Sequence, residues 1–190
     1  FNVTNLTFDG ASEMTSSTSG PGRGGDITIT GSSATVGGTI AAETSGPGAG
    51  GAILANVGTL HLTNGATVSS RSTSAQSDAG DAGQIKVQAT GTFQSDGSTV
   101  ATSAAQGKGG PITISAGNVV LTNRTLVSSE SAGSKDAGSI ALTSASDLLM
   151  RNSTVTTFAA NASGGDIKLT APNLIRIVDS TINSSVQGQA

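Results

Sequence analysis

A short anchor of the form Gly-x-Ile recurs at six positions spaced 26 to 32 residues apart along the 190-residue chain, and no other feature limits the possible folds as strongly. The anchor isoleucines are Ile27, Ile53, Ile85, Ile112, Ile140 and Ile167, at spacings of 26, 32, 27, 28 and 27 residues. The segment Phe1-Asn2-Val3-Thr4 matches Ile27-Thr28-Ile29-Thr30 and is interpreted as the same strand one period earlier. The chain 1–190 is therefore predicted to form one domain of seven coils, which begin near residues 1, 27, 53, 85, 112, 140 and 167.

Apolar and polar residues alternate within each coil, as in strands with one buried face. The anchor strand places Ile and Val on one side, as at Ile112 and Ile114, with a mostly polar residue such as Thr113 between them. A second apolar stretch follows in several coils, for example Leu60-His61-Leu62. A third strand contributes one apolar residue in every coil: Met14, Ile40, Val68, Val100, Val127, Val155 and Ile182. Three short strands per coil, with no helical periodicity between them, predict a parallel β-helix with a narrow apolar interior.

A turn signal precedes the third strand in every coil. It consists of Asp9-Gly10, Gly37-Gly38, Asn64-Gly65, Asp96-Gly97, Asn123-Arg124, Asn152-Ser153 and Asp179-Ser180. Because Asn, Asp and Gly tolerate left-handed backbone angles, the chain is predicted to turn a corner at these pairs. The variable Gly- and Ser-rich stretches that close each coil are predicted to be exposed loops, and Ser, Thr and Gly are assigned to the outer face and corners.

Composition excludes several classes of protein. Cysteine is absent and His61 is the single histidine, which argues against disulfide scaffolds, thiolate zinc sites and catalytic triads that contain histidine. The chain has a formal charge of −3, a sequence pI near 4.9 and 2% aromatic residues, so it offers neither a basic patch nor a stacking platform for nucleic acid. No apolar run reaches the roughly 20 residues of a membrane helix. Because the sequence opens at Phe1 without a signal region, it is expected to be an interior segment or a processed chain.

Three phrases resemble the repeats of bacterial filamentous haemagglutinin-like exoproteins. They are Leu62-Thr63-Asn64-Gly65-Ala66-Thr67-Val68-Ser69-Ser70, Ala162-Ser163-Gly164-Gly165-Asp166-Ile167-Lys168-Leu169 and Ile177-Val178-Asp179-Ser180-Thr181-Ile182. The resemblance runs through all seven coils. It implies a right-handed β-helix and secretion by the two-partner route, through an outer-membrane translocator, to the bacterial cell surface or the medium. The Asn-Pro motifs of that family's secretion domain do not occur here, so the segment is interpreted as shaft.

Carboxylates are the first candidates for catalysis, because polysaccharide lyases and pectin hydrolases also use parallel β-helices and cluster Asp and Glu in neighbouring coils. Asp26 and Asp166 share one position but stand five coils apart, and the corner residues Asp9, Asp96 and Asp179 are also separated by several coils. Neighbouring coils thus offer no aligned acidic pair with a basic partner. The sequence therefore predicts no catalytic residue.

Calcium and ice are weaker alternatives. The stretch Gly22 to Ile27 approaches a calcium-binding nonapeptide, but it lacks the leading glycine and is not repeated nine residues later, and the acidic loop Asp78 to Asp81 is isolated. Thr28 and Thr30 suggest the threonine ladder of ice-binding solenoids, yet equivalent positions in other coils are mixed and carry charge. His61, Lys86 and Lys168 are predicted to point outward as ordinary surface residues. No metal, cofactor or cofactor-binding residue is predicted.

The expected function is structural and adhesive. The chain is interpreted as part of the shaft of a secreted bacterial fibre that mediates attachment to cell surfaces or between cells, with an unidentified receptor or glycan. The alternative is a carbohydrate-active β-helix enzyme. Because neither end carries a capping helix or a charged edge strand, the isolated unit is expected to associate end to end.

Overall fold

The computed structural model describes residues 1–188 and shows an all-β solenoid built from eighteen strands in about seven turns. All the strand pairs are parallel, and each strand pairs with its equivalents in the coils before and after it. The stacked coils make two sheets, of eleven and seven strands. Residues 1–188 contain no helix that could cross a lipid bilayer. At about 4.8 Å per coil, seven coils rise roughly 34 Å along the axis.

Each complete coil contributes strand segments at three positions. The first position is occupied by the N-terminal halves of β3 (Ile27–Val36) and β5 (Ile53–Leu62), and by β7 (Ile85–Ala89), β10 (Ile112–Ala116), β13 (Ile140–Ser144) and β16 (Ile167–Thr170). The second is occupied by β1 (Asn5–Phe8), the C-terminal halves of β3 and β5, β8 (Thr92–Asp96), β11 (Asn118–Thr122), β14 (Asp147–Arg151) and β17 (Leu174–Val178). The third is occupied by β2 (Glu13–Thr18), β4 (Thr39–Thr44), β6 (Thr67–Ser72), β9 (Thr99–Ala104), β12 (Leu126–Ser131), β15 (Thr154–Ala159) and β18 (Thr181–Val186).

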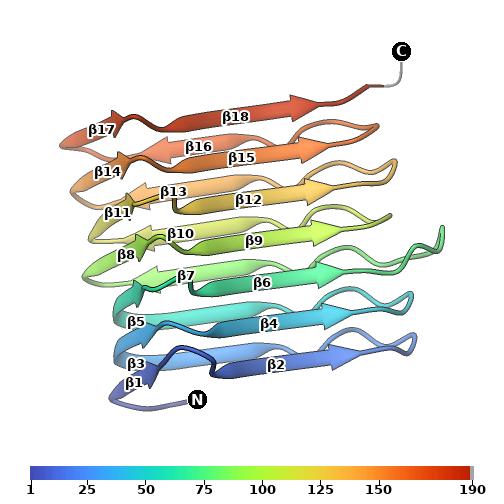
Figure 1. The fold of residues 1–190 in the computed structure, drawn as a ribbon, viewed down its shortest axis with the longest axis horizontal. Coiled ribbons are helices and arrows are strands. Elements are labelled where there is room, and N and C mark those ends of the chain that lie inside the picture. The colour runs from blue at the N-terminus through green and yellow to red at the C-terminus, as the bar shows by residue number, and fades with distance from the viewer. Residues whose placement is uncertain (189–190) are drawn as a thin grey trace.

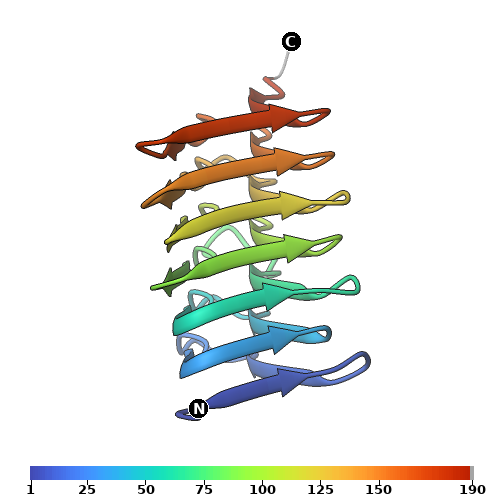
Figure 2. The ribbon, with the colours of Figure 1, turned by 90° about the vertical axis from the view of Figure 1, so that its left-hand side faces the viewer.

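The coil is right-handed. In Figure 1 the chain runs to the right along the near side through β2 and β4, returns to the left along the far side through strands such as β7 and β10, and rises toward the C-terminus. This hand is the one that the twist of parallel strands favours in crossover connections. Figure 2 faces the strands of the second position, which lie one above another from the first coil to the last.

The pairing register confirms the predicted apolar columns. The six anchor isoleucines are Cα partners from Ile27 to Ile167, and the third-strand column runs without a slip from Met14 to Ile182. In the middle coils these side chains are fully enclosed, with Ile112 and Val127 both 0% exposed. The apolar interior is therefore a continuous stack in which each coil covers the next.

The predicted register of the first coil is wrong by two residues. Asn2 forms a bridge with Thr30, which places Phe1 opposite Ile29 instead of Ile27, and Phe1 is 65% exposed. The reason is the corner: four residues separate β1 from β2, whereas two residues separate β3 from β4. Because the third strands of the first two coils stay aligned, the two extra corner residues shift the pairing of the preceding strands by two residues.

Six of the seven corners adopt the predicted left-handed angles, and the exception is Gly37-Gly38, where neither φ is positive. All the residues with positive φ in the described part of the chain belong to the turn pairs recognised in the sequence: Gly10, Asn64, Gly65, Gly97, Asn123, Arg124, Asn152 and Asp179. At Asn123-Arg124 both φ angles are positive, at 55° and 68°, and the N–H of Thr125 donates to the carbonyl of Thr122 at 3.1 Å. This is the geometry of a type I′ turn, whose second position normally holds glycine, as Gly65 does two coils earlier.

Replacing Arg124 by glycine is expected to stabilise the protein by about 1 kcal/mol, because an L-residue with a side chain pays a steric penalty at positive φ that glycine avoids. The matched control is Arg151→Gly at the end of β14, which is an exposed strand residue and has no positive φ. There the same change is expected to destabilise by roughly 0.5–1 kcal/mol. Chemical denaturation of both variants measures the change in the free energy of unfolding, which should be positive for Arg124→Gly and negative for Arg151→Gly. A loss of stability in both variants would contradict backbone strain at Arg124.

The glycine of the Gly-x-Ile anchor is required by close contact between coils. A Cβ atom built on Gly83 would lie 2.0 Å from the carbonyl oxygen of Gly51, and one on Gly110 would lie 2.0 Å from that of Gly83. Backbone atoms cannot yield to such a contact, so only glycine fits where these segments stack. The repeated anchor thus pairs a glycine that lets neighbouring coils approach with an isoleucine that fills the interior.

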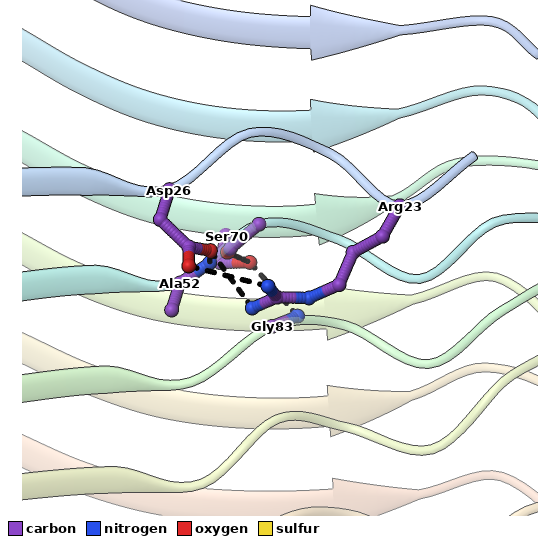
Figure 3. A network of polar contacts seen from close by, with 6 residues as sticks. Arg23, Asp26, Ala52, Ser70 and Gly83 are labelled. Carbon is purple, nitrogen blue, oxygen red and sulfur yellow. Dashed lines mark hydrogen bonds and ion pairs between the residues drawn. The ribbon is translucent and has the colours of Figure 1, made fainter.

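Fifteen Ser and Thr residues are buried. Some of them, such as Ser153, lie at corners as expected, but those that point inward from strands contradict the assignment of Ser and Thr to the outer face and corners. One of these sets forms a column at the third strand: Ser70, Thr102, Ser129 and Thr157, all 0% exposed. The hydroxyl of Ser70 donates to the carbonyl of Gly51 and accepts from the N–H of Gly83, at 2.9 Å each (Figure 3). These hydroxyls satisfy the backbone of the glycine column, because tightly stacked glycine segments leave some of their polar groups without a strand partner.

Ser129→Ala is expected to cost about 1–3 kcal/mol, because its hydroxyl donates to Gly110 and accepts from Gly138 in a buried position. Removing it leaves the N–H of Gly138 without that acceptor. Ser128→Ala is the matched control, since Ser128 is the neighbouring residue of β12 and its hydroxyl forms no hydrogen bond among the described residues. Thermal melts of the two variants should therefore differ by several degrees. Equal melting temperatures would contradict a stabilising hydroxyl column.

Candidate functional site

The aspartates of the loop stretches hold neighbouring coils together. Three aspartate carboxylates each accept a hydrogen bond from a backbone N–H of the next coil. The donors are Ala52 for Asp26 at 2.7 Å, Lys108 for Asp81 at 2.7 Å and Ser163 for Asp136 at 3.0 Å. In each case the donor lies 26 or 27 residues further along the chain. The sequence analysis missed this role. The available signal was that Asp81 and Asp136 each stand four residues before an anchor isoleucine.

Asp26 also forms the one ion pair within residues 1–188, with Arg23 at 2.8 Å (Figure 3). The hydrogen bond from Ala52 is the main reason why the pKa of Asp26 is lowered below its ordinary value of 3.8. Burial opposes this shift and Arg23 adds to it. Because the folded-state pKa is depressed, the small stabilisation from Asp26 is present above the ordinary value and is lost as the pH falls through the folded value. The geometry is that of a clip between coils.

The corner aspartate Asp96 is bound in the same manner. Its carboxylate accepts hydrogen bonds from the hydroxyl of Thr122 at 3.0 Å and from the side-chain amide of Asn123. Both donors belong to the next coil. Asp96 therefore stabilises the turn of the next coil. A catalytic acid would need a second carboxylate or a base beside it, whereas the carboxylate of Asp96 contacts a hydroxyl and an amide.

The structure does not bring the predicted acidic candidates together. Asp26 and Asp166 stand at opposite ends of the stack, in the coils of β3 and β16. Within residues 1–188 there is no group of three or more His, Asp or Glu side chains arranged to hold a metal ion. Of the two weak calcium candidates, Gly22 to Ile27 contains one carboxylate, Asp26, and Asp78 to Asp81 contains two, and neither belongs to such a group among the described residues.

The outward positions of the basic and imidazole side chains are confirmed. His61 is partly exposed in β5 between buried Leu60 and Leu62, and its cross-strand neighbours are Thr35 and Gln94. Lys86 and Lys168 are exposed on the outer side of the first-position strands. These side chains lie in separate coils along the solenoid, so they make neither a basic patch nor a charged cleft.

A shallow groove marks the place where the larger sheet bends from the first to the second strand position. Its volume is about 630 Å³, and it is lined by Asn56, Gln88, Ala89, Thr90, Ser115, Ala116, Gly117, Thr143 and Ala145. All nine residues are uncharged. Strand alternation places Asn56, Gln88, Ser115 and Thr143 on the outward side. It does not predict the groove, because strand periodicity says nothing about the curvature of the surface between two strands.

Comparisons with protein-family models, with curated proteins and with solved structures find no match to this chain. Its fold and its surface chemistry therefore provide the basis for a functional assignment.

Proposed function

We propose that this chain is part of the shaft of a secreted bacterial surface fibre, whose role is to extend and present adhesive surface between cells or toward a host surface. In this proposal the parent chain crosses the outer membrane through a translocator partner and remains at the cell surface or is released. The resemblance of its repeats to filamentous haemagglutinin-like exoproteins supports this assignment. The chain acts mechanically and performs no catalysis.

The observation that carries the proposal is the uniform stacking of the coils. The anchor isoleucines are Cα partners from Ile27 to Ile167, and the third-strand column runs from Met14 to Ile182 without a slip. Each inner coil therefore presents the same strand layout to the coils on both sides of it. The stability of such a stack comes from contacts between neighbouring coils, and repeating these contacts is how a solenoid shaft gains length.

The placement of the carboxylates supports the mechanical role over the enzymatic alternative. Asp26, Asp81 and Asp136 use their oxygens in hydrogen bonds between coils, and the groove at the bend of the larger sheet contains no acid or base. A lyase or glycoside hydrolase requires a proton donor and acceptor on either side of one sugar linkage. These three carboxylates and this groove therefore give the enzymatic alternative no support.

Electron micrographs of the native secreted parent chain test the shaft directly and should show a thin rod or filament. A globular particle would contradict the proposal.

A turnover assay tests the enzymatic alternative. The chain is expected to release no product from pectin, alginate or glycosaminoglycans, because no pair of aspartates with a basic partner is aligned in neighbouring coils. Ultraviolet absorbance of unsaturated products and reducing-end assays would measure this. Robust eliminative cleavage would contradict the shaft function and support the enzymatic alternative.

The melting temperature of the chain is expected to be the same in calcium and in chelator. A rise of several degrees in the melting temperature with calcium would support metal binding by the Gly-rich loops.

A further inference from the structure

The groove at the bend of the larger sheet presents one free hydrogen-bonding side chain per coil. Asn56, Gln88, Ser115 and Thr143 are successive Cα partners in β5, β7, β10 and β13. The hydrogen bonds formed within residues 1–188 involve none of these four side chains. Their amides and hydroxyls therefore face outward as unused donors and acceptors, repeated at about 4.8 Å along the shaft axis.

The floor of the groove is kept open by the stacking of the coils. A Cβ atom on Gly117 would lie 2.7 Å from the carbonyl oxygen of Gly91, and one on Gly58 would lie 2.3 Å from that of Ser32. These glycines stand where the chain bends between the first and second positions. Alanine occupies the floor at Ala89 and Ala116, which are 8% and 7% exposed. The hollow is thus fixed by backbone packing, and its small lining residues leave it unfilled.

The chemistry of the lining selects the class of ligand. An acidic polymer would need basic residues along the groove and a basic one would need carboxylates, and the lining provides neither. Side-chain amides and hydroxyls both donate and accept, which suits a ligand made of hydroxyl groups. An extended chain of sugar rings repeats its hydroxyls at a spacing close to that of stacked coils. We infer that this groove binds a neutral, extended glycan that lies along the shaft axis.

This inference rests on the proposed adhesive function and gives that function a ligand class. No Trp or Tyr occurs in the chain, and no aromatic side chain lines the groove, so each site binds weakly through hydrogen bonds alone. A long fibre with many such coils gains its attachment strength from multivalency, because every further contact becomes intramolecular once the first has formed. Weak single sites on a repetitive shaft are therefore consistent with strong adhesion by the fibre.

Saturation-transfer NMR tests the inference, since it detects weak ligands on receptors of any size, including associated rods. The probes are two neutral hexasaccharides, cellohexaose and mannohexaose, and the acidic hexagalacturonate. The groove variant is Gln88→Ala/Ser115→Ala. The control variant is Lys86→Ala/Thr113→Ala, which alters the same two strands two residues earlier on the same outer face and outside the groove. Circular dichroism and melting curves establish that both variants keep the solenoid.

We expect saturation transfer to at least one neutral hexasaccharide, an affinity reduced tenfold or more in the groove variant, and no change in the control variant. Three results would overturn the inference: no transfer to either neutral probe, equal losses in both variants, or preferential binding of hexagalacturonate that disappears in the control variant with Lys86. None of these three results contradicts the proposed shaft function if the micrographs show rods. A globular parent particle whose groove still binds a neutral glycan would instead contradict the shaft function and support the glycan site.

Discussion

Replacement of Ile112 by aspartate is expected to lower the stability of the solenoid by roughly 5 kcal/mol and its melting temperature by roughly 10–20 °C. Ile112 is 0% exposed and lies in the anchor column between Ile85 and Ile140. An aspartate there loses the apolar contacts of the isoleucine and places an unpaired carboxylate in a dry interior, where ionisation is unfavourable. Calorimetry or circular dichroism melts measure the loss.

Thr113→Asp is the matched control, one residue along the same strand. Thr113 points to the outer side between Lys86 and Ala141, so an aspartate there remains hydrated and gains a lysine neighbour. The expected cost is below about 1 kcal/mol and comes from the low strand propensity of aspartate. If the two variants melted at the same temperature, the assignment of inward and outward columns would be wrong.

The features that the sequence predicts well are those that recur with the period of the coil. The anchor isoleucines and the third-strand column from Met14 to Ile182 are apolar in every coil, and the pairing register follows them. The corner pairs are equally readable, because a left-handed angle restricts the choice of residue. Even there, Arg124 shows that neighbouring structure can hold a residue at an angle it does not favour.

The features that the sequence predicts poorly depend on contacts between residues of similar appearance. Ser128 and Ser129 are adjacent and chemically identical, yet only Ser129 bonds to the glycine segments inside the coil. A hydroxyl is compatible with either face, so composition alone assigned the serines to the surface. The offset of Phe1 arose from two extra corner residues, which a strand pattern does not count.

The candidate surface illustrates the same limit. That Gln88 and Ser115 point outward follows from alternation, but the groove between them and the next strand position depends on a bend that only the folded chain defines. The aspartates that link neighbouring coils are equally hard to predict from the sequence, since Asp81 accepts a hydrogen bond from the N–H of Lys108 only when the two coils are stacked. Periodicity thus predicts the stack of coils, while the chemistry of its surface depends on how neighbouring coils contact each other.

The 190-residue chain, studied alone, is expected to associate end to end in a concentration-dependent manner. Its last coil exposes Ile177 and Ile182 at 44% and 40%, although their partners in the coil below, Met150 and Val155, are 0% exposed. The strand edges beside them carry backbone donors and acceptors without a partner strand among the described residues. The first coil of a second copy offers strands at the second and third positions, β1 and β2, so head-to-tail contact there covers the apolar column and part of the edge.

Two double variants separate this contact from a nonspecific one. Ile177→Lys/Ile182→Lys places two charges in the exposed end of the interior column and is expected to shift the chain to monomer in sedimentation velocity, because stacking would bury both unpaired charges. Val178→Lys/Thr181→Lys adds the same charge at the neighbouring outward positions and is expected to leave association intact. Monomer for the unmodified chain at high concentration, or equal loss in both variants, would contradict association through the end of the coil stack. Filaments that persist in the control and disappear in the inward variant would identify the exposed end of the coil stack as the contact between copies of this chain.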